Sequence, residues 1–533
     1  MIDFRHMKIY KYLASALLLV SAGCSKDFLT TTPEGGTVGS SKIEKYNKEN
    51  PSVGASIQDA LAKGLYSWMY TQEAGGLNGN HSDFGQKSID LCLDVLSGDF
   101  VKYKIDDYGW FGDLQQYQVT ASKTANYNYM PWRYFYRMVF TANGIIDGLG
   151  GDEANPESAE ARHSLGQALG VRGYAYFYLT QCFSSEYKPN DALVPIYRSL
   201  KEIDNPVSTQ KEVYDRTIAD LSRAAELLKD FSKTSAYEIS ADVAKVYLAY
   251  TYAAMGEYDK VKSLTEEIMG SGKYLPFSLN DILYPQPLKF YKDKSGNQHL
   301  GDPVESCGMG DASLPGVMWG VDITEDMGLN LVSYWGQIDL FSYSYTAAGE
   351  PFVCNEKLYA SIPEGDRRKA QYFMLGEGKI LPLNKFYHKD RTIMKQYILE
   401  ADYVYMRYDE VILLNAEANA FLGNDAEARK VLKDYLSYAP DGAKSRVADT
   451  SYLDALSGQS LKDEIYHQIR IEFLGEGRSL FALRRFKKTA EFGTNRADLQ
   501  WQGKSMRYDD PRMSFKIPEN EEVNNPNLYK SKK

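Results

Sequence analysis

Two stretches of the sequence, far apart along the chain, share one pattern: a helix-forming run, a glycine and a second helix-forming run. They read YAAMGEYDKVKSLTEEIM at Tyr252–Met269 and NAFLGNDAEARKVLKDYL at Asn419–Leu436. Gly256 and Gly423 occupy the same place between the two runs. Glycine is favoured there if the backbone takes a positive φ angle, or if the helices approach too closely for a side chain. Each stretch is therefore predicted to form a helical hairpin.

A hairpin of two amphipathic helices cannot bury its apolar faces alone and must stack on neighbouring elements. This requirement is typical of tetratricopeptide-like helix pairs. Because the two stretches are not in tandem, we predict that such units are dispersed through the chain. Two unrelated hairpins are the alternative interpretation.

A helical region is predicted over residues 56–275, with consecutive amphipathic helices from 156 onward. Asn155 followed by Pro156 predicts one helix start, and Thr209 with Glu212 three residues later predicts a capping box at another. Residues 276–533 form the second predicted region, which contains helices over 401–490.

Regular periodicity fades over residues 276–400, where the sequence is loop-like and PGVMWGVDIT supplies a short strand. A chain of 533 residues is also too long for one small core. We therefore predict a mainly α fold, in which tetratricopeptide-like helix pairs form a scaffold and a large irregular, loop-rich lobe contains short strands.

The N-terminus carries a signal-peptide pattern over residues 1–23, with translation starting at Met1 or Met7. Basic residues precede the apolar run LASALLLVSA, which is far shorter than the ~20 residues of a membrane span. Gly23 and Cys24 follow this run and resemble the lipobox of bacterial lipoproteins, in which the cysteine is acylated. Ser21 departs from that motif, which prefers an aliphatic residue there. Ordinary signal cleavage and secretion is the alternative.

Cys24 is thus predicted as a lipid attachment point, followed by a polar tether and N-terminal segment over 24–55. The other four cysteines show no CxxC pair or zinc-like spacing. Cys92 and Cys182 stand in apolar surroundings and are predicted to be buried. A Cys307–Cys354 bridge is conceivable, but spacing alone does not decide it.

The formal net charge of −10, without a basic block, argues against a nucleic-acid partner. The sequence contains no HExxH, GxSxG or P-loop motif, and its six histidines are dispersed, so no cofactor or metal site is predicted. Acidic residues are plentiful, however, and paired carboxylates for glycoside hydrolysis would be set only in three dimensions.

Five segments, in order, resemble the SusD/RagB family of Bacteroidetes outer-membrane lipoproteins. The segments are CSKDFLTTTPEG, LGQALGVRGYAYFYLTQCF, YVYMRYDEVILLNAEANAFLGN, IRIEFLGEGRSLFALRRF and FKIPENEEVNNPNL, which together run from Cys24 to Leu528. Ala482 departs from the family pattern, which has Asp at this place, and SSEYKPNDALVP differs from the usual loop after the aromatic helix.

The resemblance implies a cell-surface nutrient-binding lipoprotein, anchored by lipid to the extracellular face of the outer membrane. Such proteins capture oligosaccharides, or in some members peptides, and deliver them to a SusC-like TonB-dependent transporter. No catalysis is implied. A peptide-binding protein of the same architecture and a glycoside hydrolase remain the alternatives, as does a tetratricopeptide adaptor that binds only protein.

Sugar binding needs exposed aromatic faces together with polar groups that receive hydroxyls. Two segments combine these features outside helical periodicity, and the resemblance draws the ligand surface from loops in the same regions. The first offers Asn78, Asn80, His81, Asp83, Tyr108, Trp110 and Phe111; the second offers Tyr334, Trp335, Gln337, Tyr343 and Tyr345. Trp110 and Trp335 are the leading candidates, whereas Trp132 and Trp319 are predicted to lie in the core.

Charged residues crowd the two family-like helical segments near the C-terminus. Charges in such apolar surroundings must pair in order to be buried. We therefore predict internal salt-bridge networks, rather than ligand contacts, for Arg407, Glu410, Glu417, Arg470, Glu472, Glu476, Arg478 and Arg484.

Overall fold

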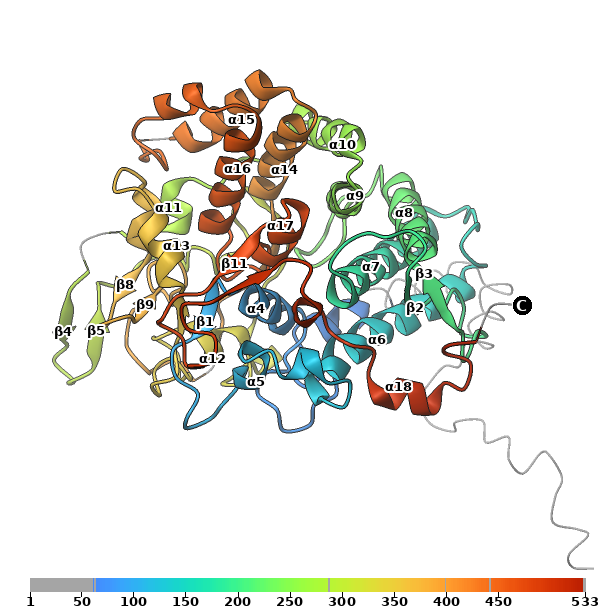
Figure 1. Cartoon of the computed structure of the whole chain (residues 1–533), viewed down its shortest axis with the longest axis horizontal. Helices are drawn as coiled ribbons and strands as arrows, with labels where there is room; N and C mark the ends of the chain where they lie inside the picture. The colour runs from blue at the N-terminus through green and yellow to red at the C-terminus, as the bar shows by residue number, and fades with distance from the viewer. Residues whose placement is uncertain (1–60, 62–63, 286–287, 398, 441, 531–533) are drawn as a thin grey trace, which may run out of the picture. The chain divides into compact units, whose positions relative to one another are not determined.

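The computed structural model describes residue 61 and residues 64–285, 288–397, 399–440 and 442–530, which all belong to one compact unit (Figure 1). The predicted signal peptide, Cys24 and the tether over 24–55 lie outside the described residues. No helix among the described residues is long and apolar enough to cross a membrane. The domain boundary near residue 275 stays a prediction.

Long helices pack against one another in chain order and form the scaffold. Neighbouring helices contact each other from α6 to α10, and α10 then contacts α14, which packs on α15 and α16 (Figure 1). Their bounds are α6 Asn126–Gly148, α7 Ala159–Phe183, α8 Gln210–Leu227, α9 Ala241–Met255, α10 Tyr258–Gly270, α14 Tyr408–Phe421, α15 Asp425–Ser437, α16 Gly458–Glu472 and α17 Ser479–Arg485.

The two predicted hairpins are present as α9–α10 and α14–α15. Gly256 and Gly423 end the first helix of each pair with φ angles of 80° and 79°. A Cβ atom built on either glycine would meet no atom within 4 Å. The left-handed backbone conformation, and not close helix approach, is therefore the reason for glycine. The hairpins also stack on each other, because α10 packs on α14.

Of the two helix starts predicted from capping residues, one is confirmed and one is wrong. The capping box at Thr209 and Glu212 is formed at the start of α8. The predicted start at Asn155 and Pro156 is wrong, because α7 begins at Ala159 and the Ser158 side chain accepts the Ala161 N–H. Serine at the cap satisfies an amide of the first turn that would otherwise lack a partner.

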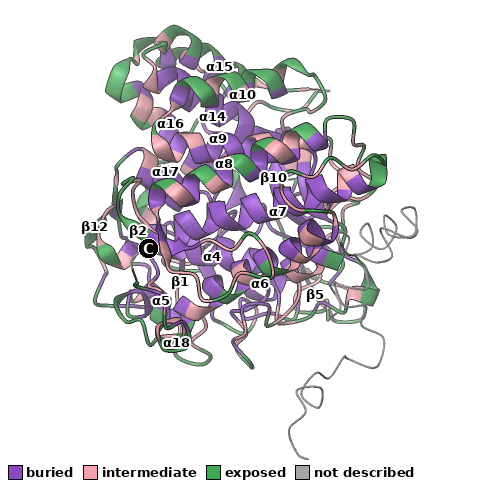
Figure 2. Cartoon of the chain, turned by 90° about the vertical axis from the view of Figure 1, so that its right-hand side faces the viewer, coloured by how far each residue is buried: buried purple, intermediate pink, exposed green. Residues whose placement is uncertain are grey.

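Helix α4 (Gln86–Ser97) lies in the interior, with every residue buried (Figure 2). It packs on α17 and on strand β1 (Phe100–Lys102). The other short helices of the described residues are η2 Tyr66–Met69, α5 Gly112–Gln115, η3 Val119–Ala121, α11 Leu279–Ile282, η4 Glu325–Met327, α12 Tyr334–Ile338, α13 Glu356–Ser361, η5 Arg367–Gln371, η6 Ser451–Ala455, η7 Pro511–Met513 and α18 Glu519–Asn524.

The strands are short and occur only as antiparallel pairs within the described part of the chain. The pairs are β1 with β7 (Phe352–Cys354), β2 (Ala192–Pro195) with β3 (Val207–Thr209), β4 (Phe290–Lys292) with β5 (Gln298–Leu300), β6 (Val317–Val321) with β10 (Tyr403–Arg407), β8 (Phe373–Met374) with β9 (Ile380–Leu381) and β11 (Thr489–Glu491) with β12 (Ser505–Arg507). Strand β6 confirms the strand predicted in PGVMWGVDIT. The predicted fold class, mainly α with short strands in an irregular lobe, is confirmed.

The predicted ion-pair networks are formed in the interior. Arg407 pairs with Glu472 and Glu476, each at 2.9 Å, and all three side chains are buried. Three further pairs join Arg478 to Glu410, Arg470 to Asp99 and Arg485 to Glu417. Arg484 differs from the prediction, because its guanidinium donates to the carbonyls of Gln181 and Met513 rather than to a carboxylate.

The four described cysteines, Cys92, Cys182, Cys307 and Cys354, are free and buried. The conceivable Cys307–Cys354 bridge is therefore not formed. Trp132 and Trp319 are core residues, as predicted, with exposed fractions of 4% and 0%.

Candidate functional site

One antiparallel strand pair brings the two predicted ligand segments together. Strand β1 pairs with β7 so that Lys102 lies opposite Phe352, and the Tyr103 N–H donates to the Pro351 carbonyl at 3.1 Å. The chain that leaves β1 carries Tyr108 and Trp110, and the chain that enters β7 carries Tyr345. Residues more than 200 positions apart thus meet at one end of the pair, as follows from the register.

Four rings from three chain segments form a cluster at this point, which we call the aromatic cluster: His81, Tyr108, Trp110 and Tyr345. His81 stacks on Trp110, with ring centroids 5.0 Å apart and 14° between planes. Tyr345 meets Tyr108 edge-on at 4.9 Å and Trp110 at 6.2 Å. Tyr345 is the buried floor, Tyr108 is 50% exposed, and His81 and Trp110 are half-buried.

Hydrogen bonding and burial set the protonation of the cluster. The Tyr345 hydroxyl is hydrogen-bonded to Nδ1 of His81. Burial lowers the pKa of His81, and Glu73 only partly opposes this effect, so the imidazole is neutral at pH 7. Burial raises the pKa of the Tyr345 hydroxyl, with further contributions from neighbouring groups. The cluster therefore offers neutral ring surfaces with polar edges, which suits an uncharged polyhydroxylated ligand.

Buried polar groups support the rings from below. The Glu350 carboxylate accepts the backbone N–H groups of Asp107, Tyr108 and Gly109 at 2.6, 2.9 and 3.2 Å. Lys102 Nζ donates to the Glu350 carbonyl at 2.8 Å, and Gln337 Nε2 donates to the His81 carbonyl at 2.8 Å. These contacts connect the three chain segments that carry the four rings.

The first segment contains residues that shape its loop instead of facing a ligand. Asp83 is buried and accepts the backbone N–H groups of Gly75 and Leu77, at 2.8 and 2.9 Å. Asn80 accepts the Ser82 N–H at 2.8 Å and is half-buried, whereas Asn78 is exposed. The prediction of an exposed Asp83 is therefore wrong, because its carboxylate is buried and hydrogen-bonded to the backbone of its own loop.

Three predicted aromatic contacts are buried. Trp335 and Tyr334 are each 2% exposed, and the Trp335 Nε1–H donates to the Ala401 carbonyl at 2.7 Å. The Tyr334 hydroxyl donates to the Gly475 carbonyl at 2.8 Å. Phe111 is fully buried and packs on Phe352. Their predicted exposure is wrong, because glycines and polar neighbours in the sequence do not show that α12 is buried or that Phe111 packs on β7.

Tyr343 is exposed, as predicted, but belongs to a second ring pair beside the cluster. Its ring lies 5.4 Å from that of Tyr397, and the two side chains are 45% and 61% exposed. Sequence reasoning missed Tyr397, whose only signal is an isolated aromatic residue in the irregular stretch MKQYILE. It also missed Glu350 and Lys102, which carry no local signal because their role depends on tertiary contacts.

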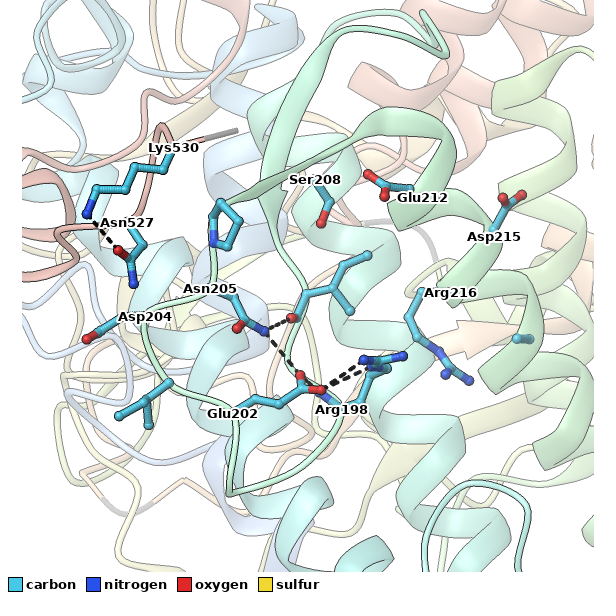
Figure 3. Close-up of a pocket in the computed structure, with 14 residues that line it drawn as sticks. Arg198, Glu202, Asp204, Asn205, Ser208, Glu212, Asp215, Arg216, Asn527 and Lys530 are labelled. Atoms are coloured by element: carbon cyan, nitrogen blue, oxygen red, sulfur yellow. Dashed lines mark hydrogen bonds and ion pairs between the residues drawn. The ribbon is translucent and has the colours of Figure 1, made fainter. Parts of the chain in front are cut away.

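A wide groove of about 1320 Å³ lies elsewhere, between the loop over 196–206, helix α8 and the C-terminal segment (Figure 3). No aromatic residue lines it. Arg198 pairs with Glu202 at 3.1 Å (Figure 3). Arg216 pairs with Asp152 and Asp220, so both guanidinium groups that line the groove already have carboxylate partners. The groove lacks ring faces on which a sugar could stack.

A smaller cleft of about 350 Å³ adjoins this groove. It is lined by Trp132, Tyr136, Tyr197 and the 64% exposed Phe140, together with aliphatic side chains. Tyr136 packs on both Trp132 and Tyr197, which leaves Phe140 as the exposed ring. Throughout the described residues, no group of three or more His, Cys, Asp or Glu side chains is arranged to hold a metal ion.

Two family models match the sequence. The SusD-like model described as "Starch-binding associating with outer membrane" matches residues 44–252, and the SusD/RagB model described as "SusD family" matches residues 376–531. A comparison with curated proteins gives no match.

Solved structures resemble the chain over most of its length. A SusD-like carbohydrate binding protein from Bacteroides vulgatus ATCC 8482 is 20% identical, with 89% of this chain and 97% of that chain covered and a TM-score of 0.69. Surface glycan-binding protein A from Bacteroides uniformis is 16% identical, with 88% and 98% covered and a TM-score of 0.62. At these identities the likeness establishes the fold.

Proposed function

Because the chain belongs to the SusD/RagB family, we propose that it is a nutrient-binding protein that captures oligosaccharides at the aromatic cluster. It acts at the outer face of the outer membrane and passes its cargo to a SusC-like TonB-dependent transporter. It performs no catalysis.

The aromatic cluster is the observation that carries the proposal. Pyranose rings present C–H faces that stack on aromatic side chains, while their hydroxyls need hydrogen-bonding groups at the edge. Tyr108 and Trp110 supply ring surface, and Asn78, on the chain segment that leads to His81, is exposed. Two structural relatives are named for carbohydrate or glycan binding, which supports the same cargo class.

Binding to a panel of oligosaccharides by isothermal titration calorimetry tests the cargo and the site together. Tyr108→Ala and Trp110→Ala should each weaken binding about tenfold or more, as for loss of a stacking ring. Phe140→Ala is the matched control, since it removes an exposed ring from the distant cleft. Unchanged affinity in both cluster variants, or a loss confined to Phe140→Ala, would overturn the site assignment.

The same panel separates the alternative cargoes. Binding of a peptide pool, with every glycan failing to bind, would make the protein a peptide carrier of the same fold. Release of reducing sugar from a polysaccharide would instead identify a glycoside hydrolase.

The anchor and the partner need tests of their own. Labelling with a fatty-acid probe should mark the wild-type protein but not Cys24→Ala. The transporter should co-purify with the membrane-bound protein. A protein secreted without label would overturn the anchor while leaving the binding proposal in place.

A further inference from the structure

We infer that Glu350 is the positioning residue of the aromatic cluster: its buried carboxylate fixes the backbone over Asp107–Gly109 and thereby sets where Tyr108 and Trp110 face the ligand. The inference rests on the proposed function for its ligand, and it adds a role for a residue that touches no ligand. Glu350 thus orders the loop of Tyr108 and Trp110 before a ligand binds.

The loop that carries the rings depends on this carboxylate for its hydrogen bonds. Residues 103–109 belong to no helix or strand. One carboxylate oxygen of Glu350 accepts from Asp107 and Tyr108, and the other accepts from Gly109. A carboxylate has enough lone pairs for all three donors, and charge-assisted bonds are about twice as strong as neutral ones. Gly109 has a φ angle of 74°, which turns the chain around the carboxylate.

The burial of Glu350 indicates that its carboxylate serves to bind the backbone N–H groups of the loop. Its exposed fraction is 0%, and a buried charge is costly unless it is paired and hydrogen-bonded. Lys102 is also fully buried; its Nζ donates to the Glu350 backbone carbonyl and lies 4.4 Å from the centre of the Phe352 ring. Even where a buried charge is paired, its replacement with apolar residues is often neutral for stability. Stability alone therefore does not account for the arrangement.

Lys102 and Gln337 connect the segment that ends in Glu350 to the segment that carries His81. Lys102 Nζ lies 3.4 Å from Gln337 Oε1, and Gln337 in turn holds the His81 carbonyl. His81, Tyr108 and Tyr345 are therefore fixed relative to one another before any ligand arrives. Ordering a loop on binding costs affinity, so a site that is already ordered binds more tightly for the same contacts.

Hydrogen exchange with mass spectrometry tests the role of Glu350 without a ligand. In Glu350→Gln, the amides within residues 105–112 should exchange about tenfold faster or more, because an amide side chain loses the charge and cannot accept from three donors. Glu238→Gln is the matched control: Glu238 is also buried and accepts the N–H groups of Thr234 and Ser235, at 2.6 and 2.9 Å, in a different loop. It should leave residues 105–112 unchanged.

Affinity for the oligosaccharide found by the panel supplies the second readout. Glu350→Gln should weaken binding about tenfold, while Glu238→Gln should not. Glu350→Asp keeps the charge beside Lys102 but withdraws the carboxylate by one methylene, and it should show the same two effects if Glu350→Gln fails to fold.

Unchanged exchange over 105–112 would overturn the inference, as would faster exchange with unchanged affinity. If the wild-type protein binds no glycan, the proposed function fails, and the exchange rates alone decide whether Glu350 holds the loop.

Discussion

The ring of Tyr258 stacks on that of Phe421, with centroids 4.2 Å apart and planes inclined by 8°. Tyr258 opens α10 and Phe421 closes α14, so the contact joins the two hairpins that share a sequence pattern. The Tyr258 hydroxyl also donates to Glu417 Oε1 at 3.3 Å. Stacking of hairpins that are distant in sequence explains how dispersed units can bury their apolar faces.

This contact should be measurable by a double-mutant cycle. Tyr258→Leu and Phe421→Leu should each destabilise the protein, and their coupling energy in urea unfolding should be about 0.5–1.5 kcal/mol. Tyr258→Phe, which keeps the ring and removes only the hydroxyl, should retain most of the coupling. Additive effects of the two leucine variants would show that the stack does not join the hairpins.

Gly256→Ala and Gly423→Ala should each lower the free energy of unfolding by about 1 kcal/mol, because alanine disfavours a left-handed backbone. The control is Gly270→Ala at the end of α10, which has equally open space but no positive φ angle. Gly270→Ala should be neutral or slightly stabilising. If all three variants lost the same free energy of unfolding, the left-handed backbone conformation would not be the cause.

Asp94 should make the protein less stable as the pH rises from about 4 to 8. Burial raises the pKa of this carboxyl from 3.8 to about 8, although the Gly477 N–H, 3.1 Å away, opposes the shift. The folded state therefore binds a proton that the unfolded state has released, and stability falls by up to about 1.4 kcal/mol per pH unit in this window.

Asp94→Asn keeps an acceptor for Gly477 and removes the titration. Its gain in thermal midpoint over the wild type should therefore grow between pH 5 and 8. A constant difference across that range would mean that Asp94 is ionised in the folded protein.

Arg407→Met should be strongly destabilising, by about 3–5 kcal/mol, because it leaves buried carboxylates short of a partner. Arg507→Met is the contrasting variant: Arg507 pairs with Asp509 at 2.9 Å on the surface, where solvent screens the charges, so its loss should change the stability little. Urea unfolding of the two variants checks the difference, and equal losses would contradict a special role for the buried network.

The same network predicts acid sensitivity. Burial would raise the pKa of Glu476, but Arg407 and Lys385 outweigh it and lower the pKa to about 2. The lowered pKa contributes stability that is present above pH 4.5, the ordinary pKa of a glutamate, and is lost as the pH falls toward 2. Unfolding free energies between pH 5 and 2.5 should therefore fall less steeply in Arg407→Met than in the wild type.

Local sequence patterns determined much of the scaffold. The glycine between paired helical runs located both hairpins, and Thr209 with Glu212 located the start of α8, because turn and cap preferences act within a few residues. Buried pairing was also predictable for Arg407 and Glu472, since charges in apolar segments need partners.

The tertiary structure alone decided which of the candidate aromatic residues reach the surface. Trp110 and Trp335 both stand near glycines in irregular sequence, yet one is half-buried in the aromatic cluster and the other is 2% exposed. The difference depends on the β1–β7 register and on packing around α12, which join residues hundreds of positions apart. Burial is a property of such distant contacts, and so is the role of Glu350; neither leaves a periodic trace in the sequence.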